Sequence, residues 1–106
     1  MIYEYRCYEA AAGRLADLHR RFAEIELPLM KQLGIHVVGL WETDPGTGEL
    51  QWMVRWQSKD ERSRLWKAFA EDPGWLEAKR RSEIAGKLVV NVRSTLLVPT
   101  AYSPLP

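Results

Sequence analysis

The 106-residue sequence predicts an α+β fold in which a four-stranded antiparallel sheet carries helices on one face only. Three observations support this prediction. Residues 2–9 alternate as a strand does, the strand-then-helix order occurs twice along the chain, and the middle of the chain is typical of a hairpin. Because crossovers are right-handed, both helical segments should cover the same side of the sheet.

The first helical segment is predicted by an apolar stripe at spacings of three and four residues. Pro28 has no N–H to donate to the carbonyl of Glu24, so we expect a kink or a break near Leu27. Gly34 should end the helix, because a left-handed backbone costs glycine little. The stripe comprises Leu15, Leu18, Phe22, Ile25, Leu29 and Leu33.

A hairpin is predicted in the middle of the chain. Residues 35–43 are β-branched and aromatic, residues 44–48 supply turn chemistry, and residues 50–56 alternate strictly. One face of the second hairpin strand is entirely apolar and needs a cover. That face consists of Leu50, Trp52, Val54 and Trp56.

The second helical segment is predicted in two pieces. Ser58 is the expected N-cap of the first piece, and Glu61 reaches back to it as the partner in a capping box. Asp72 followed by Pro73 repeats the start signal of a helix. A second short helix should therefore run from Pro73 to about Ala85.

Residues 88–97 form the last predicted strand, which completes a β-α-β-β-α-β order. This is the split βαβ, or ferredoxin-like, arrangement. Because no stretch resembles a linker, residues 1–98 are predicted to form one domain. Residues 99–106 are rich in proline and are predicted to form an extended C-terminal arm.

Composition and charge argue against several classes of function. The formal net charge of +1 gives no reason to expect nucleic acid or a membrane as a partner. The basic clusters Arg20-Arg21 and Lys79-Arg80-Arg81 are interpreted as solvated helix ends that complement the helix dipole. Cys7 is the only cysteine, and neither a leader nor a membrane-spanning apolar stretch is visible, which favours the cytoplasm.

The helix-free face of the sheet is expected to be covered by a second copy of the chain. The third and fourth strands carry apolar side chains on faces that the helices alone would not cover. A bare patch with tryptophans in it is larger than monomers usually expose. We therefore expect a homodimer in which two sheets pack face to face as a closed α+β barrel.

A polar network is predicted on the first strand. Glu4, Arg6 and Tyr8 share one face of this strand, which is central in the predicted sheet. A partly buried carboxylate and guanidinium should pair, and Asn91 and Arg93 on the neighbouring strand could complete the network. The network is either a polar layer that fixes register or dimer geometry, or the polar end of a cavity that orients a substrate carbonyl or carboxylate.

The five tryptophans either fill the core and the interface or line a pocket. Trp66 and Trp75 lie on predicted helices and are interpreted as packing residues. Trp41, Trp52 and Trp56 are the better candidates for the walls of a pocket.

The sequence lacks the motifs of common catalytic and metal sites. It has no Gly-rich phosphate loop, no nucleophile elbow and no metal-ligand pair at a useful spacing. We expect no metal and no cofactor, with a haem on His36 as the one alternative. His36 or Tyr8 could transfer protons in a cavity, whereas Cys7 points to the opposite face and should be an inert buried thiol.

Several short strings occur in a fixed order over nearly the whole chain. They are Met1-Ile2-Tyr3-Glu4-Tyr5-Arg6, Leu27-Pro28-Leu29, Gly34-Ile35 through Val38-Gly39, Trp56-Gln57-Ser58, Asp72-Pro73-Gly74-Trp75 and Thr95-Leu96-Leu97-Val98-Pro99-Thr100. In this order and spacing the chain resembles the NIPSNAP family. The resemblance implies a fold like the dimeric α+β barrels, which include cofactor-independent monooxygenases, isomerase-like proteins and haem enzymes. It supplies no set of catalytic residues, because fold and function separate freely in this group.

Two functions remain open at this point. The first is binding of a small aromatic or polyketide-like molecule, with cofactor-free oxidation or isomerisation as the possible chemistry. Its polar groups would be Glu4, Arg6, Tyr8, His36 and Arg93, with Trp41 and Trp52 on the walls. The alternative is a non-catalytic interaction or scaffolding module that uses the dimer and the C-terminal arm as its binding surface.

Overall fold

The structure is a computed structural model that describes residues 1–106. The order of its elements confirms the predicted β-α-β-β-α-β arrangement, with both helical segments interrupted. None of the helices combines the length and the apolar character needed to cross a bilayer. The elements are β1 (Ile2–Ala10), α1 (Leu15–Arg21), the π-helical turn η1 (Phe22–Glu26), α2 (Leu27–Leu33), β2 (His36–Glu42), β3 (Glu49–Trp56), α3 (Lys59–Glu71), α4 (Pro73–Ser82) and β4 (Val89–Leu97).

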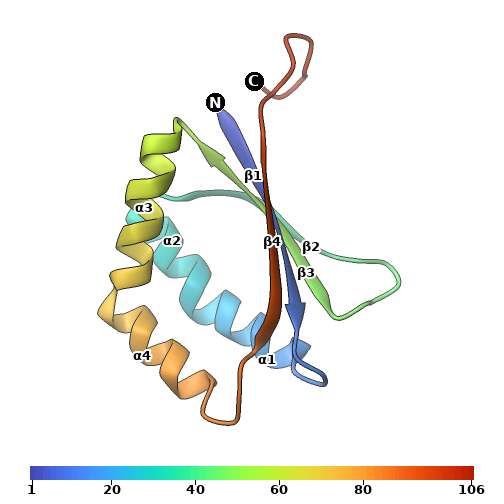
Figure 1. Cartoon of the computed structure of the whole chain (residues 1–106), viewed down its shortest axis with the longest axis vertical. Coiled ribbons are helices and arrows are strands. Elements are labelled where there is room, and N and C mark those ends of the chain that lie inside the picture. The colour runs from blue at the N-terminus through green and yellow to red at the C-terminus, as the bar shows by residue number, and fades with distance from the viewer.

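The four strands form one antiparallel sheet in the order β2-β3-β1-β4. The helices lie against one face of this sheet, and the other face carries no helix (Figure 1). The prediction of a two-layer α+β fold is therefore confirmed. Strands β3 and β1 occupy the centre, so their side chains meet neighbours on both sides.

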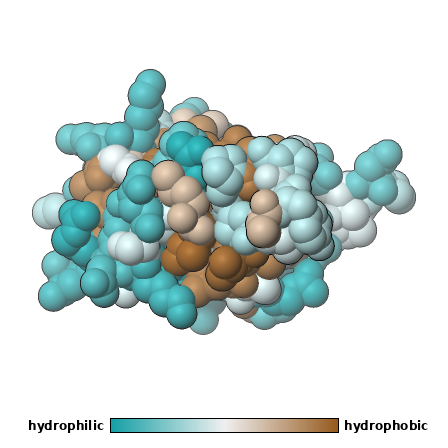
Figure 2. Space-filling model, turned by 90° about the horizontal axis from the view of Figure 1, so that it is seen from above, coloured by the Kyte–Doolittle hydropathy of each residue, from teal (hydrophilic) through white to brown (hydrophobic).

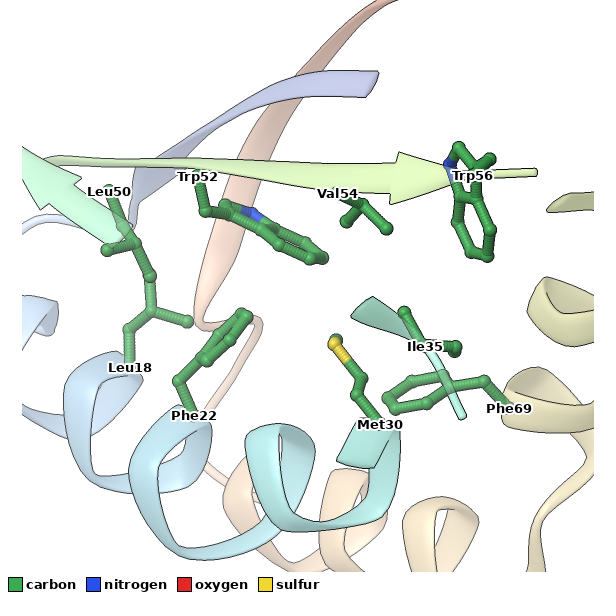
Figure 3. Close-up of a cluster of buried hydrophobic side chains, with 9 residues drawn as sticks. All are labelled: Leu18, Phe22, Met30, Ile35, Leu50, Trp52, Val54, Trp56 and Phe69. Atoms are coloured by element: carbon green, nitrogen blue, oxygen red, sulfur yellow. The ribbon is translucent and has the colours of Figure 1, made fainter. Parts of the chain in front are cut away.

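The core forms where the apolar face of β3 meets the helices. Figure 3 shows Trp52, Val54 and Trp56 pointing from the strand towards Phe22 and Met30 on the helical layer. The strict alternation of β3 explains this, because side chains two apart share a face. Trp52 and Trp56 are fully buried and fill much of this space.

The first helical segment changes its hydrogen-bond register before Pro28. The N–H of Leu27 donates to the carbonyl of Phe22, which closes a π turn, and α2 then begins with Pro28 as one of its first residues. The irregularity predicted near Leu27 is thereby confirmed. The wide turn has a further consequence: Glu26 is buried, whereas Ile25, which belonged to the predicted apolar stripe, is 36% exposed. The left-handed backbone of Gly34 ends the segment, as expected.

The N-caps of the second helical segment form at Ser58 and Asp72 as predicted, but the Glu61 carboxylate accepts from the N–H of Gln57 (3.4 Å) and not from that of Ser58. Ser58 Oγ accepts a hydrogen bond from the Glu61 N–H at 3.1 Å, and Asp72 Oδ2 accepts one from the Trp75 N–H at 2.9 Å. These bonds satisfy N–H groups that a helix start leaves unpaired. Helix α4 ends at Ser82, before the predicted boundary near Ala85.

The C-terminal arm is not extended, contrary to the prediction. The Ser103 N–H donates to the Thr100 carbonyl at 3.1 Å, so the chain turns back on itself. The hydroxyl of Tyr3 then donates to the Pro106 carbonyl at 2.9 Å. The arm therefore lies beside the N-terminal end of β1, where Figure 1 shows both termini. Prolines set local backbone angles but do not prevent a turn between them.

Candidate functional site

A cavity of about 500 Å³ lies between the helices and the β1–β4 side of the sheet. This volume falls within the range of about 300–1,000 Å³ that is typical of small-molecule sites. Aromatic and apolar side chains make up most of its lining, and charged side chains complete it. Its lining includes Arg6, Tyr8, Arg21, Glu26, Met30, Trp66, Phe69, Trp75, Lys79, Glu83, Lys87, Val89 and Val92.

Glu4 is the structural centre of the polar network behind this cavity. Its carboxylate is fully buried and accepts six hydrogen bonds. Burial alone would raise the pKa of Glu4, but the bonds from Arg62, Ser94, Trp66 and Arg6 outweigh it and hold the pKa far below its usual range. Glu4 therefore stays ionised and anchors its neighbours. The donors are Arg6 Nη1 (2.6 Å), Arg62 Nε (2.8 Å), Arg62 Nη2 (3.2 Å), Ser94 Oγ (2.7 Å), Trp56 Nε1 (3.0 Å) and Trp66 Nε1 (2.9 Å).

Arg6 extends from the Glu4 network into a cage of aromatic rings. Its guanidinium carbon lies 5.5 Å from the Tyr8 ring centroid, 5.4 Å from that of Trp52 and 5.2 Å from that of Trp66. Arg6 Nη1 donates to Glu4 and Nη2 donates to the Tyr8 hydroxyl, whereas the buried Nε has no acceptor. Each Nη atom carries a second N–H beyond the one already used, and the Arg6 side chain lines the cavity, so the guanidinium can donate to an incoming oxygen.

Glu26 faces Arg21 at another part of the cavity wall. Arg21 Nε donates to Glu26 Oε1 at 2.8 Å, and both side chains are buried. Arg21 is itself held by Ser82, Glu83 and the ring of Trp75, whose centroid lies 5.0 Å from the guanidinium carbon. Burial raises the pKa of Glu26 to about 7, although the charge and hydrogen bond of Arg21 oppose this.

Four of the residues predicted from the sequence lie together. Glu4, Arg6 and Tyr8 project towards the helices from β1, opposite Val54, Trp52 and Leu50 of β3. Trp52 lies against the ring of Tyr8, at a centroid distance of 5.6 Å. The expected shared face of β1 is therefore real, and it is the face that the helices cover.

The other three predicted site residues lie on the opposite face of the sheet. Arg93 is opposite Cys7 in the β1–β4 register and forms an ion pair with Glu49 at 2.9 Å. His36 pairs with Arg55, and Trp41 pairs with Gln51, both on the helix-free side. These positions separate Arg93, His36 and Trp41 from the cavity that Arg6 lines.

The expectation that Arg93 and Asn91 complete the Glu4 network is wrong. The register places Ser94 opposite Arg6, so Ser94 and not Arg93 turns towards Glu4. A shift of one residue along a strand moves a side chain to the other face of the sheet. The alternation of β4 alone did not reveal which of its two alternating sets of side chains faces the helices. The second arginine of the network is Arg62, from α3.

The roles expected of the tryptophans are confirmed only in part. Trp66 and Trp75 pack against the core as expected, but they also line the cavity. Trp52 and Trp56 are sealed in the core, and Trp41 is half-exposed on the far face. Position on a helix or a strand does not decide which ring borders a cavity; the way in which the layers meet decides it.

Sequence reasoning missed two charged residues of the site, Arg21 and Glu26. Arg21 was interpreted as part of a solvated cluster, yet it is 8% exposed and paired with Glu26. A signal was present for Glu26: it lies four residues after Phe22 and four before Met30, on the buried side of the helical segment. A charged residue at such a position is rarely tolerated without a partner or a function.

The structure contains no group of three or more His, Cys, Asp or Glu side chains that could hold a metal ion. On the helix-free face, the thiol of the buried Cys7 donates to Glu49 Oε2 at 3.2 Å, and Arg93 Nη2 lies 3.2 Å from its sulfur. The expectation of a buried thiol on that face agrees with this placement.

The order of elements, the antiparallel sheet and the single helical layer define the protein as an α+β domain of the ferredoxin-like class. The family can be stated more narrowly. The model of the NIPSNAP family matches residues 3–104, so the chain belongs to the NIPSNAP family. No curated protein sequence matches the chain.

Solved structures of other proteins share this fold. A NIPSNAP family protein from Agrobacterium tumefaciens superposes with a TM-score of 0.86 at 24% identity, covering 99% of this chain and 98% of that one. An uncharacterised NIPSNAP domain protein from Burkholderia xenovorans gives a TM-score of 0.83 at 24% identity, covering 98% and 99%. A protein from Deinococcus radiodurans described as a candidate antibiotic biosynthesis monooxygenase gives 0.62 at 16% identity, covering 94% and 93%.

Proposed function

We propose that this protein binds a small aromatic molecule with an oxygen anion or carbonyl in the cavity beside Arg6. One observation carries the proposal: the cavity of about 500 Å³ combines aromatic walls with a guanidinium whose two Nη atoms each keep an unused hydrogen. Pockets with mostly apolar walls and a few convergent polar groups are the usual form of a ligand site.

The aromatic and the charged side chains of the cavity suggest a ligand with an aromatic ring and an oxygen-bearing group. The indole rings of Trp66 and Trp75 offer flat apolar surfaces to an aromatic ring. The remaining Nη hydrogens of Arg6 would bind a carbonyl or carboxylate oxygen, with Glu4 holding the guanidinium in place. Arg6 is thus preorganised, because its position is determined before any ligand arrives.

The chemistry that fits this cavity is cofactor-free oxidation or isomerisation of the bound molecule. Both reactions begin with removal of a proton beside a group that can carry negative charge. The fold shared with the Deinococcus radiodurans protein is compatible with such chemistry but supports it only by analogy.

We also propose that a second copy of the chain covers the helix-free face of the sheet. The proposed location of this dimer is the cytoplasm. Leu97 on this face is 43% exposed and Trp41 is 51% exposed. Seen from the end that carries both termini, hydrophobic side chains remain visible between hydrophilic ones (Figure 2). A symmetric dimer would bury the same patch on both copies.

The alternative function is a scaffolding module that uses the C-terminal arm. It is favoured by the exposure of large apolar side chains there, because Tyr102 is 87% and Leu105 is 53% exposed. Such side chains are typical anchors in protein interfaces. The alternative requires no ligand in the cavity.

The proposal is tested by binding of 2-naphthoate, a bicyclic aromatic carboxylate, measured from the quenching of tryptophan fluorescence. Arg6→Met keeps much of the side-chain volume and removes the donors, so it should weaken binding about tenfold or more, as loss of a charged hydrogen bond does. Arg64→Met is the matched control, since Arg64 is exposed on α3 and makes no hydrogen bond.

Sedimentation of the same variants separates the two functions. If Arg6→Met binds 2-naphthoate as tightly as the wild type but dissociates into monomers, the polar network is structural and the site assignment is wrong. Absence of saturable binding to the wild-type protein would favour the scaffolding module.

A further inference from the structure

We infer that Glu26 is the proton-transfer group of the cavity and that it acts on the carbon next to the carbonyl of an aromatic 2-oxo acid. This inference rests on the proposed binding function and adds a reaction and a substrate class to it. It places the chemistry on a carboxylate of the π turn, not on His36, which lies on the other face of the sheet.

The geometry of Glu26 suits a base. Arg21 Nε holds Oε1 at 2.8 Å, whereas Oε2 has no hydrogen-bond donor in the protein. The residue is only 2% exposed, yet it lines the cavity. One carboxylate oxygen is therefore fixed and the other is left to reach a proton of a bound molecule.

The surroundings of Glu26 make it able both to take and to return a proton at neutral pH. Burial raises its pKa to about 7, against the opposing charges of Arg21 and Arg6 and with a small further rise from Glu83. A base whose pKa lies near the working pH is the most effective for this purpose. The charged and titratable groups that face it come from α1 (Arg21), from β1 (Arg6 and Tyr8) and from the residue after α4 (Glu83).

Arg6 and Tyr8 supply the site for the developing oxyanion. The Tyr8 hydroxyl accepts a hydrogen bond from Arg6 Nη2, so its own hydrogen remains free to donate. Burial raises the pKa of Tyr8, although the charge of Arg6 opposes this, which keeps the hydroxyl protonated. Donors that are fixed in advance stabilise an enolate more effectively than water does.

The substrate class follows from the groups that remain along the cavity. Lys79 and Lys87 line it and neither forms an ion pair with a carboxylate of the protein, so they are free to hold the carboxylate of a 2-oxo acid. Trp66 and Trp75 would contact the aromatic ring. The carbonyl oxygen then lies with Arg6 and Tyr8.

The reaction is a proton shift that needs no oxidant. Glu26 Oε2 takes the proton from the carbon beside the carbonyl, and the C–H bonding pair forms the C=C bond of the enolate while the carbonyl π pair moves to oxygen. Return of the proton to that oxygen gives the enol, and return to the carbon restores the ketone. Atoms and electrons balance in both directions, and the enzyme ends in its starting form.

The experiment uses phenylpyruvate as the probe. Loss of its methylene signal in D₂O, followed by proton NMR, reports proton removal, and quenching of tryptophan fluorescence reports binding. The wild type should bind the probe and accelerate exchange. Glu26→Gln should retain binding and lose about 100-fold or more of the exchange rate, which is the usual effect of removing a general base.

The controls separate the base from its surroundings. Glu24→Gln alters an exposed carboxylate of the same turn and should leave exchange unchanged. Glu26→Asp should retain part of the rate, and it provides the comparison if the glutamine variant does not fold. The double variant Lys79→Glu/Lys87→Glu should weaken binding at least about tenfold, whereas Lys67→Glu, on the exposed side of α3, should not.

Each outcome decides the question. Equal exchange rates for the wild type and Glu26→Gln would overturn the role of Glu26. Binding of phenylpyruvate without faster exchange would also overturn the inference, while the proposed binding function would stand. If the wild type bound 2-naphthoate but not phenylpyruvate, the substrate class would be wrong.

Discussion

Replacement of Glu26 by glutamine should change how the stability of the protein depends on pH. Glutamine resembles the protonated acid in size and can still accept the hydrogen bond of Arg21, but it does not titrate. Burial raises the pKa of Glu26 from 4.5 to about 7, with Arg21, Arg6 and Glu83 as the charged groups around it. The variant removes this one titration and leaves the surrounding groups in place.

The sign and the size follow from linkage. Since the folded state binds the Glu26 proton more tightly than the unfolded state, the stabilisation is fully present below pH 4.5 and is lost as the pH rises through about 7. The full loss is at most about 3 kcal/mol, at about 1.4 kcal/mol for each pKa unit. The free energy of unfolding of Glu26→Gln, relative to the wild type, should therefore increase by up to about 3 kcal/mol between about pH 5 and about pH 8.

Urea unfolding followed by tryptophan fluorescence measures this difference at each pH. Subtracting the wild-type values cancels the titrations that both proteins share. One of these is the titration of Glu4, whose lowered pKa stabilises the folded state at pH values above the ordinary pKa of a glutamate. A constant offset between the two proteins would reflect packing and is of no consequence. A difference that stays flat across the range, or that decreases with pH, would refute the assignment of a raised pKa to Glu26.

Two further changes test the network and the dimer. Glu4→Gln should lower the free energy of unfolding by about 3 kcal/mol or more, because Arg6 and Arg62 lose a buried carboxylate. Glu9→Gln, at an exposed position on the same strand, should have little effect. Similar urea midpoints for the two variants would contradict this expectation. Leu97→Lys should shift a sedimenting dimer towards monomer at micromolar concentration, and Ile84→Lys, exposed after α4, should not. A compact wild-type monomer at that concentration would remove the basis for the dimer.

The elements of the fold were largely predictable because their signals are local. The caps at Ser58 and Asp72 and the stop at Gly34 depend on hydrogen bonds and backbone angles within a few residues. The alternation of β3 likewise depends only on the strand period. Such features appear in the sequence because the residues that make them are neighbours along the chain.

The site was predictable only in part, because it depends on register and on how the layers meet. The β1 residues Glu4, Arg6 and Tyr8 were grouped correctly, since the strand period alone places them on one face. Arg93 was grouped with them wrongly, because the β1–β4 register that puts Ser94 there is a property of two strands far apart in the sequence.

The amino-acid order by itself determined which segments become strands and helices, and so the single helical layer on an antiparallel sheet. Only the tertiary structure decided that the π turn before Pro28 buries Glu26 beside Arg21, and that Trp66 and Trp75, not Trp41, border the cavity. The physical reason is that burial depends on which segments pack together, and the energy of a charged group depends on that burial, which no local pattern encodes.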